Sequence, residues 1–307
     1  MIVVSEFMDP EAVRKMEAAT QVVYDPGLVD APDDLIQALG DATALVVRNR
    51  TQVSEALLAA APNLKCVGRL GVGLDNIDLD ACATRGVEVY PAIGANNLSV
   101  AEYVLGTAMA LLRGAYSANN RMMSGDWPRQ DCAGRELSGK VLGLVGLGSI
   151  ARDTAERAIA LGMEVAAFDP FVDADDPIWH SVGPLDLDRL LQTADVVSLH
   201  VPLVDATRHL INADRLVAMK SDAILINAAR GGVVDDTALA AALKAGEIGG
   251  AALDVFETEP LTQDAARVFQ DAPNLILTPH IAGVTVESNV RVSGLIAERV
   301  LAHLDLN

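Results

Sequence analysis

The sequence predicts an α/β protein with two doubly wound parallel sheets, and two observations carry this prediction. Short runs of branched apolar residues alternate with helix-like segments along nearly the whole chain. Such alternation is typical of parallel strands that are covered by helices on both faces. In addition, 51% of the 307 residues are hydrophobic, which is enough to bury a separate core in each of two ordinary domains.

The clearest unit is a strand, a glycine-rich turn and a helix in the middle of the chain. The apolar run 141–145 leads into the turn Gly146–Ala151, and a helix is predicted directly after it. Gly146 permits a tight turn, and Gly148 lets the backbone approach a pyrophosphate, which would meet free N–H groups at the positive end of the helix. The small Ala151 lets the helix pack on the strand. The pattern indicates a Rossmann-like dinucleotide-binding domain.

The next strand adds an acid at the expected distance. The run 164–168 ends at Asp169, and 169 − 146 gives 23 residues from Gly146. This is close to the ~20 residues expected for the acid that holds the adenosine ribose hydroxyls. Because an acid there repels a 2′-phosphate, NAD rather than NADP is the predicted cofactor. The alternative is that Asp169 and Pro170 only form a turn after a strand.

The first 97 residues show the same strand–helix rhythm but have no glycine-rich turn after their first strand. We therefore expect them to form a substrate domain. The predicted strands are 2–4, 21–24, 44–48, 65–68 and 87–89, with a helix capped by Asp9-Pro10 and others near 33–39, 54–61 and 78–84.

A long apolar segment follows, and we expect one buried helix from Leu98 to about Ser124 that bridges two domains or two subunits. Glu102 and Arg113 make a membrane helix the poorer interpretation. The last helix, about 285–304, is expected to return to the first domain. The predicted domains are then 1–97 plus 285–307 and 98–284, with a cleft between them. The strands expected in the second domain are 141–145, 164–168, 196–199, 223–227, 250–253 and 275–277.

The amino-acid composition argues against several classes of function. The formal net charge of −19 opposes binding to nucleic acid and to anionic membranes. The three cysteines, Cys66, Cys82 and Cys132, fit neither a disulfide framework nor a zinc site. No signal peptide and no apolar run of ~18 residues is evident. We expect a cytoplasmic protein that binds no metal, no nucleic acid and no membrane.

Charged residues follow three strands of the predicted second domain. Arg230 comes after the run 224–227, Asp254 and Glu259 come after 250–253, and His280 comes after 275–277. Open α/β sheets bind ligands at the carboxyl ends of their strands. An arginine, an acid and a histidine that converge there form a set suited to acid–base chemistry on an anion.

Several stretches together resemble the D-isomer-specific 2-hydroxyacid dehydrogenase family, and phosphoglycerate dehydrogenase-like members are nearest in pattern. One departure is Ala151, where a third glycine is more usual. Some phosphoglycerate dehydrogenases also carry a C-terminal regulatory domain, for which we expect no room here. The matching stretches are 69–78, 97–102, 146–151, 219–231, 253–257 and 279–283.

The resemblance implies three catalytic residues. His280 would protonate the substrate carbonyl oxygen during reduction and accept the proton in the reverse direction. Glu259 would orient His280 and favour its imidazolium form, although Glu257 is a rival for this role. Arg230 would hold the 2-oxoacid carboxylate and polarise the carbonyl. The structural alternatives are a helix cap or a surface ion pair for Arg230, a capping role for His280 and a loop end for Glu259.

The resemblance also implies binding residues. His200 would line the adenine side of the cofactor or be a hydrogen-bonded core histidine, and Asp254 would orient the nicotinamide amide. Arg48 and Arg50 would meet a second anionic group or form a solvated loop pair. The implied cofactor residues are Gly146, Gly148, Ser149, Ile150, Asp169, His200, Pro202, Ala228, Asp254 and Gly283; the implied substrate residues are Arg48, Arg50, Leu70, Gly71, Val72 and Gly73, with Arg69, Trp127 and Arg129 as further candidates.

The resemblance leaves the substrate open. Two arginines favour a doubly anionic acid such as 3-phosphoglycerate or 3-sulfolactate, and glyoxylate or hydroxypyruvate reduction is the alternative. A formate dehydrogenase is the poorer interpretation, because formate dehydrogenases carry Gln where Glu259 stands in this sequence. A function of another class is NAD sensing, as in corepressors that share this fold. A homodimer through helix 98–124 is expected.

Overall fold

The computed structural model describes residues 1–306, and these form two compact units. Unit 1 combines residues 1–96 with the segment that begins at Val284, and unit 2 is Asn97–Gly283. Each unit has its own parallel sheet and its own buried cores.

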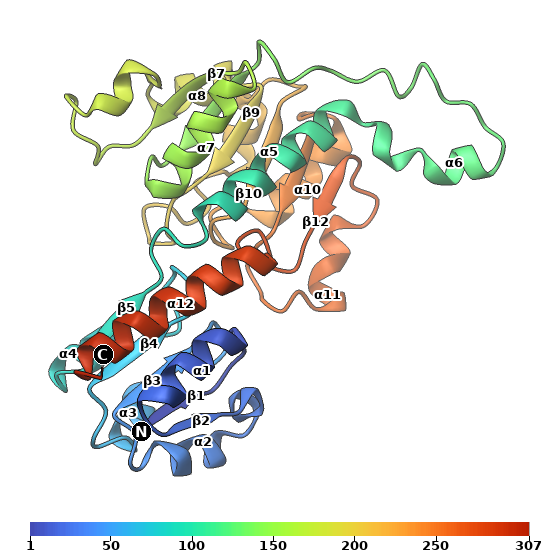
Figure 1. The fold of residues 1–307 in the computed structure, drawn as a ribbon. Coiled ribbons are helices and arrows are strands. Elements are labelled where there is room, and N and C mark those ends of the chain that lie inside the picture. Colours follow the sequence, from blue (N-terminus) through green and yellow to red (C-terminus); the bar gives the residue numbers. More distant parts are fainter. Residues whose placement is uncertain (307) are drawn as a thin grey trace. The chain divides into compact units, whose positions relative to one another are not determined.

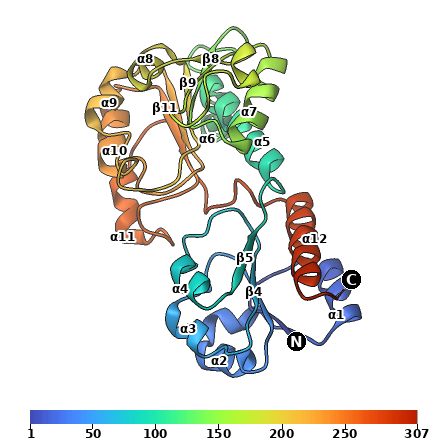
Figure 2. The same cartoon turned by 90° about the vertical axis from the view of Figure 1, so that its left-hand side faces the viewer.

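The described part of unit 1 contains a five-stranded parallel sheet in the order β2-β1-β3-β4-β5. Helices α1 and α12 cover one face, and α2, α3 and α4 cover the other (Figure 2). The elements are β1 (Ile2–Val4), α1 (Pro10–Ala19), β2 (Val22–Tyr24), η1 (Pro26–Asp30), α2 (Pro32–Leu39), β3 (Ala44–Val47), α3 (Glu55–Ala59), β4 (Cys66–Arg69), α4 (Leu79–Thr84), β5 (Glu88–Pro91) and α12 (Val286–His303).

Unit 2, whose backbone is described throughout, contains a seven-stranded parallel sheet in the order β12-β11-β10-β9-β6-β7-β8. Helices α5 and α7 pack on one face, while α8, α9 and α10 pack on the other (Figure 2). The strands are β6 (Val141–Val145), β7 (Glu164–Phe168), β8 (Gly183–Pro184), β9 (Val196–Leu199), β10 (Ile224–Asn227), β11 (Gly250–Leu253) and β12 (Leu275–Leu277). The helices are α5 (Asn97–Arg113), η2 (Ala115–Ser117), α6 (Asn119–Met123), α7 (Ser149–Ala160), η3 (Pro177–His180), α8 (Leu187–Thr193), α9 (Ala213–Ala218), α10 (Asp236–Ala245), α11 (Gln263–Ala266) and η4 (Arg267–Phe269).

Strand order determines where each sheet can bind a ligand. In unit 2 the direction in which successive strands are added to the sheet reverses between β6 and β9, and in unit 1 it reverses between β1 and β3. Loops on the two sides of such a switch point leave the sheet in opposite directions and open a crevice at the carboxyl ends of the strands. The glycine turn after β6 lies at this point in unit 2, and Arg48 follows β3 in unit 1.

Side-chain caps explain where many helices begin. Asp9 accepts a hydrogen bond from the N–H of Glu11 at the start of α1, and Asp235 accepts one from Ala238 at the start of α10. Thr285 and Ser288 form a reciprocal capping box at the start of α12. Such caps satisfy N–H groups that have no partner within the helix. Helix α12 then packs against α1 and β4 with Val292, Ile296 and Val300 buried.

Two expectations about unit 2 are wrong. The segment 98–124 is not one helix, because α5 ends at Arg113 and Gly114 adopts a left-handed φ of +60°, which stops the helix before η2 and α6. The sheet also has a seventh strand, β8, which pairs with β7. This strand is only two residues long and contains a proline, so no periodic pattern marks it in the sequence.

None of the helices within residues 1–306 has the length and apolar character needed to cross a membrane. The same residues contain no group of three or more His, Cys, Asp or Glu side chains arranged to hold a metal ion.

Candidate active site

His280 lies in the loop after β12 and is held by its backbone as well as by its ring. Its N–H donates to the Asp254 carbonyl at 2.8 Å, and its φ of +57° is in the left-handed region, which is rare for a side chain of this size. The ring Nδ1 lies 2.8 Å from Oε2 of Glu259. With Nδ1 bound to the carboxylate, Nε2 remains to face a ligand.

Glu259 is fixed at both oxygens. Its Oε1 accepts a hydrogen bond from the Phe256 N–H at 3.0 Å, while Oε2 meets His280. Burial raises the pKa of Glu259, but the hydrogen bond and charge of His280, the Phe256 N–H and the charge of Arg230 together outweigh burial and leave this pKa below its usual value. The carboxylate is therefore an anion that orients the imidazole at neutral pH.

The rival acid, Glu257, points to a different cluster. Its Oε1 lies 3.2 Å from Nε2 of His209 and accepts a hydrogen bond from the Asp236 N–H at 3.2 Å. Burial raises the pKa of the adjacent Asp236 carboxyl to about 6. Of the two glutamates, the structure brings only Glu259 to His280.

Arg230 follows β10 and lies near the same acid. The Asn227 side chain shapes the turn, because its Nδ2 donates to the Arg230 carbonyl at 2.9 Å and its Oδ1 accepts from the Ala229 N–H at 3.1 Å. A Cβ at Gly231 would collide with the backbone of Phe256, so only glycine lets these two loops lie in contact. The charge of Arg230 is close enough to help lower the pKa of Glu259. Glu259 and His280 are therefore in contact, and the charge of Arg230 acts on the same pair.

Asp254 is buried, with 1% of its surface exposed, and anchors the histidine loop. Its Oδ1 accepts hydrogen bonds from the Thr278 hydroxyl at 2.6 Å and the Ile281 N–H at 2.8 Å, and its Oδ2 accepts one from the Ala282 N–H at 2.7 Å. Because the Thr278 hydroxyl donates its hydrogen bond to the carboxylate, the Tyr103 hydroxyl, 2.7 Å away, is the donor to Thr278. Sequence reasoning missed both hydroxyl residues, since neither stands in a recognisable motif.

The glycine turn fits a dinucleotide pyrophosphate. Gly146 has a φ of +91°, and a Cβ there would collide with the carbonyl of His200 after the neighbouring strand β9. A Cβ at Gly148 would instead point into open space. This leaves the start of α7, with Ser149 and Ile150 in its first turn, accessible to an anion. Ala151 is buried against the sheet, as its small size allows.

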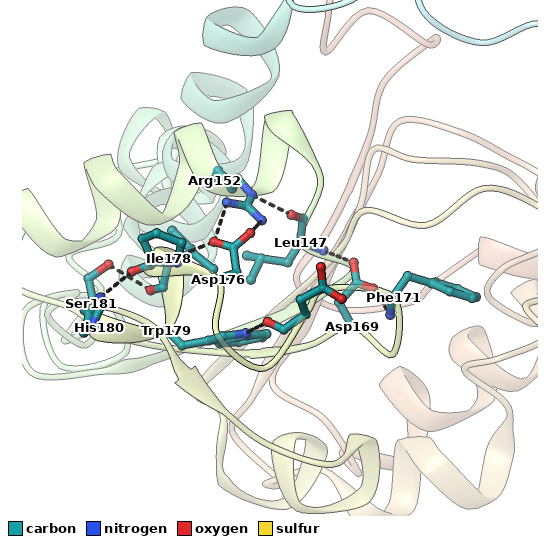
Figure 3. Close-up of polar contacts among 11 residues, drawn as sticks. Leu147, Arg152, Asp169, Phe171, Asp176, Ile178, Trp179, His180 and Ser181 are labelled. Atoms are coloured by element: carbon teal, nitrogen blue, oxygen red, sulfur yellow. Dashed lines mark hydrogen bonds and ion pairs between the residues drawn. The ribbon is translucent and has the colours of Figure 1, made fainter.

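Asp169 lies beside this turn (Figure 3). Its Oδ2 accepts a hydrogen bond from the Leu147 N–H at 2.7 Å, and its Oδ1 accepts one from the Phe171 N–H at 2.9 Å. Each oxygen keeps a second acceptor site, so the carboxylate is oriented and still able to accept hydroxyl groups. This arrangement fits a ribose diol.

The other expected cofactor residues lie at the ends of strands or close behind them. The ring of His200 lies 2.9 Å from the Ser198 hydroxyl, and burial lowers the pKa of His200 to about 4, so this histidine is neutral. Pro202 follows it after β9, Ala228 follows β10, and Gly283 follows the Asp254-bound Ala282.

In unit 1, Arg48 and Arg50 have different environments. The Arg48 guanidinium donates to Oδ1 of Asn289 at 3.2 Å, and burial lowers its pKa. Arg50 forms an exposed ion pair with Asp30, whose hydrogen bond raises the arginine pKa. Sequence reasoning missed Glu6, a buried acid that holds this loop by accepting hydrogen bonds from the N–H groups of Arg48, Arg50 and Thr51 at 2.8, 3.2 and 3.0 Å.

The expected carboxylate-binding turn follows β4. Leu70 is buried, its N–H donates to the Val47 carbonyl, and the Gly71 N–H donates to the Arg69 carbonyl, both at 2.8 Å. These two N–H groups are used within the protein. The N–H groups of Val72 and Gly73 are therefore the donors of this turn that could bind a substrate carboxylate.

Comparison with known proteins identifies the family of the chain. Residues 105–282 match the family model for the NAD binding domain of D-isomer specific 2-hydroxyacid dehydrogenases. The chain is 53% identical over 300 residues to an (S)-sulfolactate dehydrogenase of Chromohalobacter salexigens, an alignment that covers 97% of this chain and 96% of that protein.

Two further known proteins resemble this chain, and the alignments cover different shares of their lengths. A D-3-phosphoglycerate dehydrogenase of Archaeoglobus fulgidus is 39% identical over 301 residues, which cover 98% of this chain and 56% of that protein. The crystal structure of a D-lactate dehydrogenase from Aquifex aeolicus, complexed with NAD and lactic acid, superposes with a TM-score of 0.84 at 29% identity, covering 99% of this chain and 95% of that one.

The sequence resemblance is thus confirmed by an NAD-binding family model and by nearly full-length similarity. The chain is an NAD-dependent oxidoreductase that acts on the CH–OH group of a 2-hydroxy acid, and it belongs to the D-isomer specific 2-hydroxyacid dehydrogenase family.

Proposed function

We propose that the chain catalyses reversible hydride transfer between NAD(H) and a 2-hydroxy acid with a second anionic group, of the 3-sulfolactate type. The observation that supports this class of substrate is the 53% identity of the chain to an (S)-sulfolactate dehydrogenase. The arginines at positions 48 and 50 are chemically suited to a sulfonate, which accepts charge-assisted hydrogen bonds as a phosphate does.

The proposed mechanism assigns one task to each side chain. NAD(H), when bound, supplies or accepts the hydride at C2 of the acid. Arg230 holds the substrate carboxylate and polarises the adjacent carbonyl. His280, oriented by Glu259, delivers a proton from Nε2 to the carbonyl oxygen during reduction and removes it during oxidation. Asp254 keeps the histidine loop in place through its three hydrogen bonds.

Each unit is proposed to present its binding residues at the carboxyl ends of its own strands. Unit 2 binds the cofactor at the glycine turn, with Asp169 on the ribose, and also carries the catalytic residues. Unit 1 supplies Arg48, Arg50 and the N–H groups of Val72 and Gly73 for the substrate anions. These roles rest on the placement of the residues at the carboxyl ends of parallel strands. A cytoplasmic location is part of the same proposal and rests on the acidic, cysteine-poor composition.

A panel of 2-oxoacids tests the substrate. NADH oxidation with 3-sulfopyruvate should exceed that with hydroxypyruvate or glyoxylate by at least about tenfold in kcat/KM, because a second charge-assisted contact is worth roughly 1.5–3 kcal/mol. A higher kcat/KM with 3-phosphohydroxypyruvate, which also carries a second anionic group, would favour a substrate of the 3-phosphoglycerate type. A preference for hydroxypyruvate or glyoxylate would favour the small-acid reductase instead. Tight NADH binding with negligible turnover on the whole panel would identify an NAD sensor.

A homodimer is also proposed, and the segment after α5 supports it. All five residues of α6 are exposed, and this helix stands apart from the sheet of its unit (Figure 1). Met123 is 79% exposed and Trp127 is 73% exposed. Clustered apolar side chains in water are typical of a surface that another chain covers.

Sedimentation tests the dimer. The chain should sediment as a dimer at micromolar concentration, and Met123→Glu combined with Trp127→Glu should shift it towards the monomer, because charges are costly in an apolar interface. The matched control is Phe171→Glu, which changes another exposed aromatic residue outside this segment. A wild-type monomer, or an equal shift in the control, would contradict this interface.

A further inference from the structure

An ion pair lies next to the proposed ribose site and has no part in the mechanism above. Arg152, in the first turns of α7, donates from Nη1 and Nη2 to Oδ1 and Oδ2 of Asp176 at 3.0 and 2.7 Å. This two-point geometry is the strong form of an arginine–carboxylate pair. The guanidinium holds the pKa of Asp176 below its usual range, so the acid stays ionised at neutral pH.

The pair is connected to Asp169 through a single residue. Nε of Arg152 donates to the Leu147 carbonyl at 3.1 Å, and the Leu147 N–H donates to Asp169 at 2.7 Å. Figure 3 shows Arg152 and Asp176 on one side of Leu147 and Asp169 on the other. The charges of Arg152 and Asp169 are near enough to interact. The guanidinium is thus the cation nearest to the ribose acid in this network.

We propose that Asp176 is a specificity-determining residue that favours NAD over NADP by occupying both terminal nitrogens of Arg152. A 2′-phosphate on the ribose would need a cation beside Asp169 to offset their repulsion, and arginine is the side chain best suited to that contact. Because Asp176 already pairs with Arg152, this cation is withheld. The inference rests on the proposed role of Asp169 at the ribose.

The discriminating variant is Asp176→Asn. Asparagine keeps an oxygen that can accept the Ile178 N–H, which Asp176 binds at 2.9 Å at the start of η3, so the local turn is preserved. It removes the charge that engages Arg152. The matched control is Asp175→Asn, which removes one exposed charge from the same loop and leaves the pair in place.

Binding is measured by fluorescence titration with NADH and NADPH at low ionic strength, with no substrate present. Asp176→Asn should tighten NADPH binding at least about tenfold and change NADH binding less than about threefold, the gain expected for one new charge-assisted hydrogen bond to phosphate. Asp175→Asn should change both affinities by less than about threefold. The double variant Arg152→Gln, Asp176→Asn should lose the gain for NADPH.

Three results would overturn the inference. These are an unchanged NADPH affinity in Asp176→Asn, an equal gain in Asp175→Asn, or a gain that survives Arg152→Gln. The first would show that the released guanidinium does not reach the phosphate, and the second that only the charge of the loop matters. Failure of the wild-type protein to bind NADH would instead contradict the cofactor site as a whole, so the two failures are separable.

Discussion

His280→Asn is expected to lower kcat for 2-oxoacid reduction by about 10³-fold while leaving NADH affinity within about threefold of the wild type. The loss follows because no other group on the histidine loop can deliver a proton to the carbonyl oxygen, and positioned general acids contribute ~10²–10⁴-fold. Asparagine is the suitable replacement, since it tolerates the left-handed φ of +57° at this position better than most residues. Steady-state NADH oxidation and NADH fluorescence titration measure the two quantities.

The two neighbouring glutamates give a matched pair for the same site. Glu259→Gln should move the alkaline limb of the pH profile for reduction to lower pH, because the imidazolium loses the anion 2.8 Å away. Glu257→Gln, which alters the acid beside His209, should leave the profile unchanged. An equal shift in both variants, or full activity in His280→Asn, would contradict the assigned acid.

The lowered pKa of Glu259 determines how the stability of the folded state depends on acidic pH at this site. A carboxyl whose pKa is lower in the folded state stabilises that state above the ordinary pKa, and this stabilisation is lost as the pH falls through the lowered value. The contact between Glu259 and His280 should therefore persist in mildly acidic solution. A loss of activity near pH 6 must then come from another group.

Arg230→Gln should lower kcat/KM for the 2-oxoacid by about 10³-fold and leave NADH binding intact. The guanidinium is proposed to bind the carboxylate and to stabilise charge on the carbonyl oxygen, and removal of one such donor costs ~10²–10³-fold before the lost carboxylate contact is added. Steady-state kinetics with NADH and the best oxoacid of the panel give the value.

Arg230→Lys is the control for charge alone. Lysine keeps the positive charge but not the planar fork, so it should recover only a small part of the activity. The Asn227 side chain binds only the backbone of this turn, so folding should survive either replacement. Normal turnover in Arg230→Gln would remove the residue from the mechanism, and lost NADH binding would indicate a role in the cofactor site.

Much of the fold could be predicted because the strands are buried apolar runs. Strands β6, β7, β9, β11 and β12 coincide with the predicted runs, and all of them except the edge strand β12 have largely buried side chains. The helix prediction for 98–124 is wrong for a local reason. Apolar residues recur past Arg113, but Gly114 turns the backbone into the left-handed region.

The candidate site was only partly predictable. Residues at strand ends, such as Arg230 and His280, could be expected together because parallel strands end at one edge of a sheet. The choice between Glu257 and Glu259 could not be made from the sequence, because the sequence of a loop does not show in which direction its side chains point. Arg50 shows the same limit, because its ion pair with Asp30 joins two loops that have no common motif.

Sequence alone thus specified the elements of this protein: the apolar strands, the glycine turn after β6, and the acid that follows β7. These features depend on a few consecutive residues and on a regular period. Only the tertiary structure decided the partners, such as Asp254 with the loop of His280, Glu6 with the loop of Arg48, and Arg152 with Asp176. The physical reason is that a hydrogen bond requires contact within about 3 Å, and folding alone brings distant residues that close.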